Sequence, residues 1–549
     1  MTPGVYIEEK DSFPGSIVAV ETAVPAFIGY TEMASRKGRS LLNQAVRITS
    51  LAEYVELFGG AFMPKFTLDA PAANNTKPEI MVNGSPKVIN YMADNKAFMF
   101  PNIKLFFANG GGACYIVSVG TYKDKDKVVI DKDELLGTKE VGEGADKKII
   151  EGGLKMLLKE QEPTMVLMPD AVNLPGNGCY EVYVEVLKHC AKMQSRVAIL
   201  DIKDGYEYRI RGDKNVDIIT NFRESIGSEN LSYAAAYYPW LQTSIVPKKE
   251  VKFDCLSMTK EEFEKMFTED KAIEFFGGIK AKTAEPETGT EPADTPADPP
   301  ADPPANDDGD TPQPEGATAK SVDLSKFEIS ADSYHLGLLA TSPTYADLID
   351  ELWSTMNLLP ASSAMAGLYT AVDNSRGVWK SPANVSVSNV IKPAVNITHD
   401  EQENLNVDAI SGKSVNAIRT FPGVGTLVWG GRTLDGNSLD WRYINVRRTM
   451  IMLEQSIKLA LRAYVFEPND ANTWVTVKSM IINFLTEKWK QGALAGTSPE
   501  DAFEVNVGLG STMTSLDILE GKMLVSVKLA IVRPAEFIVV TFEQQMQKS

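Results

Sequence analysis

Two stretches between residues 440 and 492 repeat apolar residues at steps of three and four, the spacing that puts them on one face of a helix. The first predicts a helix over 445–464, with an apolar face of Val446, Met450, Leu453, Ile457, Ala460 and Tyr464. The second begins after the break at Pro468, with Asn472 as its predicted N-cap, and ends at Gly492. The sequence therefore predicts a pair of amphipathic helices.

The apolar period changes beyond these helices. Two runs rich in β-branched residues, over 523–532 and 536–542, predict strands, with Pro534 as the break between them. No other strand is predicted close by, and unpaired strand edges expose N–H and C=O groups that other segments can pair with. We therefore expect these terminal strands to be covered by another segment.

The first half of the chain has the pattern of an α/β fold. Two apolar runs over 164–168 and 197–200 predict buried parallel strands, joined by a helix over 179–194. Further predicted elements are strands at 26–30, 113–119 and 231–240, a helix that begins at Ser50 with a capping box, and helices at 263–276 and 345–356. The expected fold class is multidomain, part α/β and part α+β.

Two segments do not fit a packed domain. Val5, Tyr6 and Ile7 form one short β-prone run without a neighbouring hairpin partner, so residues 1–25 are expected to be an arm. Residues 283–319 contain nine prolines, ten acidic residues and no Lys, Arg or aromatic residue. Such a composition cannot bury a core, which predicts a disordered linker or surface loop.

Length and charge narrow the functional classes. The 549 residues, 44% of them apolar, are enough for two or three domains, and the net charge of −18 argues against direct nucleic-acid binding. No run of about 18 apolar residues occurs, so membrane insertion is not expected. Cys114, Cys179, Cys190 and Cys255 form no Cys-x-x-Cys pair and are predicted to be reduced core thiols.

The sequence offers little catalytic chemistry. The best enzyme hypothesis uses Asp170 and Asp201, which follow neighbouring predicted parallel strands, where α/β enzymes place functional groups. Gly176-x-Gly178 precedes a helix, but Glu181 stands at the third glycine position of a dinucleotide loop and would repel phosphate. No histidine has a second ligand at metal spacing, so neither a metal nor a cofactor is predicted.

Several segments together resemble the contractile tail sheath proteins of phages and of phage-tail-like injection systems. They are Pro3–Glu9, Ala26–Tyr30, Arg376–Asn384, Phe421–Gly425, Trp429–Leu434, Asn445–Arg448, Gly492–Gly496 and Arg533–Ile538, in this order. Residues 61–96, 121–160 and 241–330 do not share the likeness. The resemblance implies a structural, non-enzymatic subunit that stacks in hexameric rings around an inner tube and contracts from a metastable extended state to drive the tube through a target envelope.

The resemblance also suggests a division of the chain. The expected parts are an N-terminal arm (1–25), an outer α/β domain with insertions (26–282), the acidic segment (283–319), a continuation of the conserved core (320–400), an inner, tube-facing domain (401–520) and a C-terminal strand arm (521–549). The implied partners are further copies of the chain, the tube protein, and baseplate and terminator or cap proteins. Assembly is expected in the bacterial cytoplasm, within a phage tail or injection particle.

Two sets of site residues follow. The arms are expected to exchange strands between subunits through Val5, Tyr6, Ile7, Glu8, Leu524, Val525, Val527, Leu529, Ile531, Phe537, Ile538 and Val540. The tube contact is expected at Lys478, Lys488 and Lys490; Lys478 and Lys488 lie off the tryptophan-bearing face of the second helix, where they form either a cationic stripe or an ordinary solvated helix face. The alternatives are an enzyme that uses Asp170 and Asp201, and a static surface-layer or adhesin protein.

Overall fold

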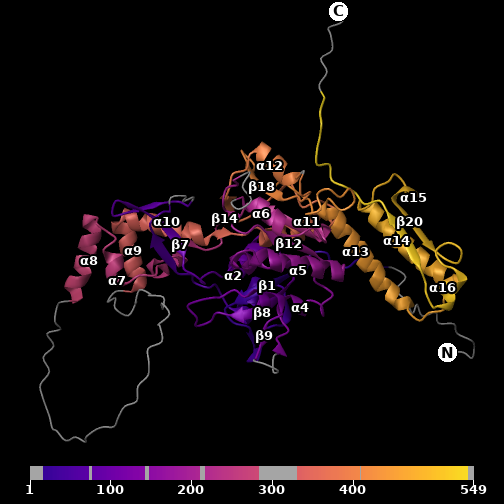
Figure 1. Cartoon of the computed structure of the whole chain (residues 1–549), viewed down its shortest axis with the longest axis horizontal. Helices are drawn as coiled ribbons and strands as arrows, with labels where there is room; N and C mark the ends of the chain where they lie inside the picture. Colours follow the sequence, from indigo (N-terminus) through magenta and orange to yellow (C-terminus); the bar gives the residue numbers. More distant parts are fainter. Residues whose placement is uncertain are drawn as a thin grey trace, which may run out of the picture. The chain divides into compact units, whose positions relative to one another are not determined.

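The computed structural model describes residues 17–72, 77–142, 148–210, 217–283, 330–408 and 410–541. The chain divides into two compact units (Figure 1). Unit 1 comprises residues 1–62, 96–245 and 357–549, and unit 2 comprises residues 63–95 and 246–356. Unit 2 is thus built from two insertions into unit 1.

Unit 1 contains a central mixed sheet. In the described part of the chain its nine strands run in the order β16 (Val385–Ser386), β19 (Gly425–Val428), β18 (Asn416–Phe421), β13 (Ala234–Tyr238), β12 (Val197–Asp201), β11 (Met165–Leu167), β1 (Pro25–Thr31), β8 (Cys114–Thr121) and β4 (Ala45–Ile48). The six strands from β18 to β8 are parallel to one another, and the strands at either edge are antiparallel. The predicted strand–helix–strand unit is confirmed as β11, α5 (Gly178–Met193) and β12.

Helices cover this sheet because its strands are apolar on both faces. They are α1 (Leu51–Phe58), α2 (Met99–Ala108), α3 (Lys132–Leu136), α4 (Gly153–Met156), α5, α6 (Ile218–Ser225), α11 (Ser362–Arg376) and α12 (His399–Asn406). Ser50 caps α1 as predicted, since its side chain accepts from the Glu53 N–H. The second bond of the predicted capping box differs, because the Glu53 carboxylate accepts from the N–H of Thr49 and not from that of Ser50. Helices α2 and α11 cross closely at Gly367, where an added Cβ would lie 2.5 Å from the carbonyl oxygen of Phe106.

Smaller strands complete this part of unit 1. β2 (Ser35–Arg36) pairs with β3 (Arg39–Ser40), and β9 (Glu140–Val141) pairs with β10 (Lys148–Ile149). A three-stranded sheet contains β15 (Leu358–Leu359), β14 (Leu241–Thr243) and β17 (Val390–Pro393). The sequence-derived boundaries separate 26–282 from 401–520, yet β13 and β18 pair directly, Tyr237 opposite Asn416. A division by sequence range therefore cuts through one sheet.

Unit 2 has its own aromatic core. It holds β5 (Phe66–Asp69), β7 (Ser85–Tyr91), β6 (Ile80–Val82), α7 (Lys260–Glu264), α8 (Asp270–Thr283), α9 (Ala331–Thr341) and α10 (Pro343–Met356). Buried rings of Phe253, Phe263, Phe267, Tyr334 and Tyr345 meet at centroid separations of 5.0–6.5 Å. The single helix predicted over 263–276 is wrong: two helices flank a break at Phe267. Residues 284–319 of the predicted linker lie outside the described residues.

The C-terminal part of unit 1 has a separate apolar core. The two predicted amphipathic helices are confirmed as α13 (Ile444–Leu461) and α14 (Ala471–Lys490), although the N-cap of α14 is Asp470, which accepts from the Thr473 N–H, and not Asn472. Leu453, Val477, Ile481 and Leu485 are buried between these helices, α15 (Pro499–Ala502) and a hairpin of β20 (Phe503–Val507) and β21 (Val525–Leu529). A short α16 (Ser515–Leu519) lies between β20 and β21 in the chain.

Candidate functional site at the roots of the two chain ends

The N-terminal segment is held along helix α13. Ile17 is buried in the C-terminal core, and Val20 donates its N–H to the Ser456 hydroxyl at 3.0 Å. The Thr22 hydroxyl donates to the Asp373 carboxylate at 2.6 Å, and the Thr22 carbonyl accepts from the Arg448 guanidinium at 3.0 Å. The chain is therefore fixed to α13 immediately before it enters β1.

Arg448 is the centre of this N-terminal root. Its guanidinium forms a forked ion pair with Asp373, with Nη1–Oδ1 and Nη2–Oδ2 distances of 3.0 and 2.5 Å, and stacks over the Tyr369 ring at 4.6 Å. Both charged side chains are almost fully buried. Forked, charge-assisted bonds of this kind fix orientation as well as adding energy, so α11 and α13 hold residues 20–22 in one place.

The point where the C-terminal run leaves the packed domain, which we call the C-terminal root, is fixed by Glu536. Its carboxylate accepts from Arg432 Nη2 at 2.6 Å and Nε at 2.9 Å, from Asn406 Nδ2 at 2.8 Å and from the Tyr443 hydroxyl at 3.0 Å. We call these four residues the Glu536 clasp. Asn445, at the start of α13, also donates to the carbonyls of Trp379 and Val532, which fixes the chain four residues earlier.

The clasp keeps the Glu536 carboxyl ionised. Burial alone would raise its pKa, but the hydrogen bonds from Arg432, Asn406 and Tyr443 and the guanidinium charge outweigh burial, so the pKa lies below its usual value. Arg432 is 3% exposed and Glu536 20% exposed. An ion pair with so little water around it needs both partners, because either charge left alone would stay buried.

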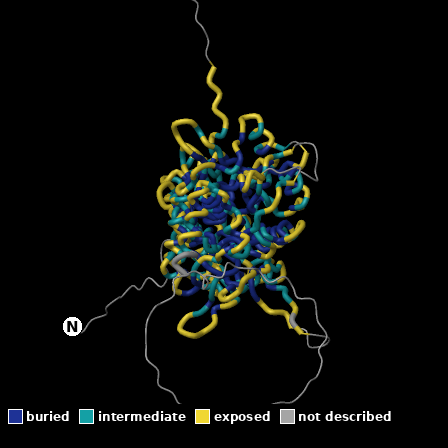
Figure 2. The backbone as a smooth tube through the Cα atoms, turned by 90° about the vertical axis from the view of Figure 1, so that its left-hand side faces the viewer, coloured by how far each residue is buried: buried dark blue, intermediate teal, exposed yellow. Residues whose placement is uncertain are grey.

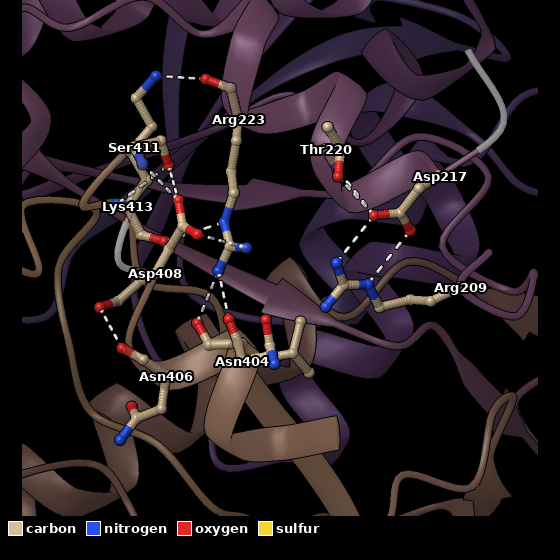
Figure 3. Close-up of polar contacts among 11 residues, drawn as sticks. Arg209, Asp217, Thr220, Arg223, Asn404, Asn406, Asp408, Ser411 and Lys413 are labelled. Atoms are coloured by element: carbon tan, nitrogen blue, oxygen red, sulfur yellow. Dashed lines mark hydrogen bonds and ion pairs between the residues drawn. The ribbon is translucent and has the colours of Figure 1, made fainter. Parts of the chain in front are cut away.

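A second polar cluster supports the clasp (Figure 3). The guanidinium of Arg223, on α6, donates to the carbonyls of Asn404, Leu405 and Lys413 and pairs with Asp408 at 3.7 Å, while Lys413 donates back to the Arg223 carbonyl. These bonds fix the loop after α12. Asn406 lies in this fixed stretch, so its amide is presented to Glu536 in a set position.

The predicted strand over 523–532 is present as β21, but the expectation that no other strand lies close to it in the chain is wrong. β21 has a partner within the chain: Val525, Val527 and Leu529 lie opposite Val507, Val505 and Phe503 of β20. Ile531 bridges to Leu494, which belongs to the Gly492–Gly496 motif, and the Leu524 carbonyl accepts from Thr512. Sequence reasoning missed β20, because Phe503–Val507 is short and directly follows the short helix α15 with no turn between them.

The run over 536–541 is not a strand of its own chain. Phe537, Ile538, Val539 and Val540 are 71%, 81%, 89% and 65% exposed. Figure 2 shows this stretch as exposed backbone that leaves the packed part of the protein. The other predicted exchange residues, Val5, Tyr6, Ile7 and Glu8, lie outside the described residues.

The lysines predicted for tube contact do not form one stripe. The exposed positions of α14 are Ala471, Asn472, Val475, Thr476, Ser479, Asn483, Glu487 and Lys490, which are mostly uncharged. Lys478 and Lys488 are half-buried and lie away from this face, with the Lys488 ammonium over the Phe484 ring at 5.6 Å. Only Lys490, of the three, is fully on the exposed face, because a helix turns by about 100° per residue.

The two aspartates of the enzyme hypothesis are buried structural groups. Asp170 accepts the N–H groups of Tyr30 and Phe98 at 2.8 and 2.6 Å, and Asp201 accepts the N–H and the hydroxyl of Ser362 at 2.8 and 2.5 Å. Both side chains are at most 1% exposed. Burial raises the pKa of each carboxyl to about 6, and the hydrogen bonds limit the rise. Each aspartate fixes the start of a helix, α2 or α11.

Two further kinds of feature, a metal-ligating cluster and a membrane-spanning helix, are absent from the part of the chain that the structure describes. There, no three His, Cys, Asp or Glu side chains gather as they would around a metal ion, and no helix is long and apolar enough to cross a membrane. The four cysteines are free and buried, as predicted.

Comparisons with known proteins agree with the motifs that meet at this site. Residues 437–545 match the family model for the phage tail sheath C-terminal domain. The tail sheath protein of Enterobacteria phage T4 is 27% identical over 177 residues, which cover 30% of this chain and about a quarter (26%) of that protein.

Solved structures match over the whole chain. A structure of the anti-feeding prophage baseplate has a chain with a TM-score of 0.56 and 25% identity, covering 100% of this chain and 99% of that one. The helical sheath of the anti-feeding prophage in its contracted state gives 0.55 and 25%, covering 99% of both chains. Residues 437–545 thus carry the phage tail sheath C-terminal domain, and the chain as a whole is similar to the sheath subunits of phage-tail-like contractile injection systems.

Proposed function

We propose that this protein is the sheath subunit of a contractile injection machine, and that its copies are joined by strands exchanged between neighbours. The observation that carries the proposal is the arrangement of the two chain ends. Arg448 and Glu536 fix the roots of both ends beside α13, while the apolar run Phe537–Val540 is exposed. An exposed, β-prone apolar run beyond a rigid anchor is a donor for strand addition.

The acceptor for these strands is the hairpin of β20 and β21. Among the described residues it is a sheet of only two strands, so β21 keeps an outer edge along Val525–Leu529. We propose that the N-terminal run Val5–Glu8 and the C-terminal run Phe537–Val540 of other subunits add to this sheet. Four to six main-chain hydrogen bonds, worth roughly 0.5–1.5 kcal/mol each, would keep subunits connected while their rigid parts rotate.

The subunits are proposed to stack as hexameric rings around an inner tube, with baseplate and terminator proteins at the two ends. Contacts that join different surfaces of identical chains build rings where the rotation closes and helical lattices where it does not. The extended lattice is a kinetic trap and contraction releases its stored conformational energy, so the subunit acts without catalysis. Lys478, Lys488 and Lys490 are proposed to contact the tube. Assembly takes place in the bacterial cytoplasm, within a phage-tail-like particle.

Negative-stain microscopy of the purified chain tests the proposal. The wild-type protein should form hollow tubes with a cogwheel cross-section, and a variant lacking residues 1–16 should remain a folded monomer without tubes. Ile7→Pro should have a similar effect because proline removes a backbone donor, whereas Ser12→Pro, outside the Val5–Glu8 run, is the matched control. Contractile tubes from the deleted variant would refute strand exchange, and a wild-type chain without tubes, even with a tube protein present, would refute the sheath function.

A further inference from the structure

The turn between α13 and α14 presents an aromatic side chain to solvent on strained backbone. Phe466 is 102% exposed, and its φ is +73°, in the left-handed region that bulky residues rarely adopt. The preceding Val465 is 60% exposed. A non-glycine residue held at such a φ costs of order 1–3 kcal/mol, and its full exposure means that the side chain gains no burial against the described residues in return. The arrangement indicates that Phe466 has a partner outside the chain.

Apolar residues from α16 accompany Phe466. Leu516 and Leu519 are 63% and 84% exposed. The turn and the α16 loop are tied together, because the Asn469 side chain donates to the Lys522 carbonyl at 3.0 Å and accepts from the Trp474 indole at 2.7 Å. We call Val465, Phe466, Leu516 and Leu519 the apolar tip.

Unit 1 also contains a pocket large enough for an aromatic side chain. It has a volume of about 330 Å³, and most of its accessible surface is apolar, although Glu21, Glu162 and Arg448 are among the residues that line it. Ile451, Met452 and Leu459 of α13 form one wall, and Val20, Thr22 and Thr164 belong to the opposite side. The pocket has room for an aromatic ring. The full exposure of Phe466 means that it does not occupy the pocket of its own chain.

We propose that Phe466 of one subunit enters the α13 pocket of a neighbouring copy. This inference rests on the proposed assembly function and deepens it by naming a contact between subunits. The tip and the pocket are different surfaces of one chain, so the contact is heterologous and can repeat from copy to copy around a ring or along a helix. Burying one aromatic ring and its neighbours covers a few hundred Å² at most, against roughly 1,200–2,000 Å² for a stable complex. The contact therefore acts within a lattice and leaves the free chain monomeric.

Substitutions at the tip separate docking from folding. Phe466→Gly removes the ring and also relieves the positive φ, so the thermal midpoint of the monomer should be unchanged or higher while tube formation falls at least tenfold. Phe466→Ala should impair assembly equally without relieving the backbone. Ile391→Ala, which removes an apolar side chain of 53% exposure on β17, is the matched control and should assemble normally.

Cross-linking tests which surface receives the tip. One full-length protein carries Phe466→Cys and a second carries Leu459→Cys; the two are mixed, assembled and treated with a short bismaleimide. Leu459 lines the pocket and is 41% exposed, while all four native thiols are buried and should not react. A covalent dimer should form in the assembled material, and the pair Phe466→Cys with Ile391→Cys should give none.

The other outcomes overturn the inference. If wild-type tubes form and Phe466→Gly also forms them at full yield, the tip is not an assembly contact, although the sheath function stands. If the Phe466→Cys protein is captured by tube protein, the tip faces the tube instead. If the thiol introduced by Leu459→Cys becomes reactive only after deletion of residues 1–16, the pocket is filled by the chain's own N-terminus. A wild-type chain without tubes would instead refute the proposed function.

Discussion

Arg432 and Glu536, 104 residues apart in the chain, are joined by a forked ion pair, with Nη2–Oε2 and Nε–Oε1 distances of 2.6 and 2.9 Å. The two residues come from the two motifs Trp429–Leu434 and Arg533–Ile538, whose likeness to sheath proteins the sequence already indicated. Their pairing gives both motifs a physical role: the first supplies the cation that holds the second. The position from which the C-terminal run leaves the domain is thereby set.

We expect Glu536→Ala to destabilise unit 1. The substitution leaves the buried Arg432 guanidinium unpaired, which should cost about 3 kcal/mol. The double variant Arg432→Met with Glu536→Met removes both charges and should recover part of that loss. Urea unfolding followed by fluorescence measures both effects. Equal loss in the single and double variants would contradict the idea that an unpaired buried charge is the cause.

The buried aspartates predict an unusual pH dependence. The folded-state pKa of Asp170 and Asp201 is raised to about 6, so each group contributes stability that is fully present below its unfolded pKa of about 4 and is lost as pH rises through 6. The stability difference between wild type and Asp201→Asn should therefore be largest near pH 3.5 and smaller at pH 7.5.

Asp217 provides the control of opposite sign. Burial acts to raise its pKa, but the ion pair with Arg209 and the bonds from Thr220 prevail and lower it. The penalty of Asp217→Asn should thus be present at pH 7.5 and fade as pH falls below 4. Thermal unfolding midpoints of both variants from pH 3.5 to 8 would measure this, and parallel profiles would contradict the opposite shifts.

The lysines of α14 should differ in their effect on tube-templated assembly. Lys490 is on the exposed face, so Lys490→Glu should reduce the yield of tube-filled sheaths more than Lys478→Glu or Lys488→Glu, and the triple variant should reduce it most. Wild-type assembly should weaken as salt rises from about 50 to 500 mM, because exposed charges are screened. Sheath-only polymers provide the control. Unchanged co-assembly of the triple variant would remove these residues from the tube contact.

Removal of the acidic segment should leave assembly intact. Helices α8 and α9, which flank residues 284–329, pack against each other in unit 2, so a short Gly-Ser linker can join them when residues 285–318 are deleted. We expect normal tubes and a free energy of unfolding within about 0.5 kcal/mol of wild type. Failure of the shortened chain to form tubes would assign the segment to a subunit interface.

Local patterns predicted the regular elements well and the tertiary connections poorly. The apolar period of α13 and α14 and the buried strands β11 and β12 followed from spacing, since each element carries its own pattern. Strand β20 was missed, so β21 was expected to lack a partner within the chain. The Arg432–Glu536 pair could not be found from one sequence, because nothing local relates two charges 104 residues apart. The break at Phe267 was hidden by continuous helix-compatible composition on both sides.

The C-terminal run offers a test that depends on strand geometry. In an extended strand, the N–H groups of successive residues point to opposite edges, so those of Phe537 and Val539 face one way and those of Ile538 and Val540 the other. If the run is donated as an outermost strand, only one of these two pairs bonds to the acceptor. Only one of the two double proline variants, Phe537→Pro with Val539→Pro or Ile538→Pro with Val540→Pro, should then abolish tubes.

The two proline variants serve as controls for each other, because both keep the same number of substitutions in the same exposed run and neither removes a contact of the Glu536 clasp. Before assembly, both variants should be folded and should have the unfolding midpoint of the wild-type monomer, which circular dichroism measures. Loss of tubes in both variants would mean that the run lies between two other strands, since each edge would then need its donors. Normal contractile tubes from both would contradict strand donation by this end of the chain.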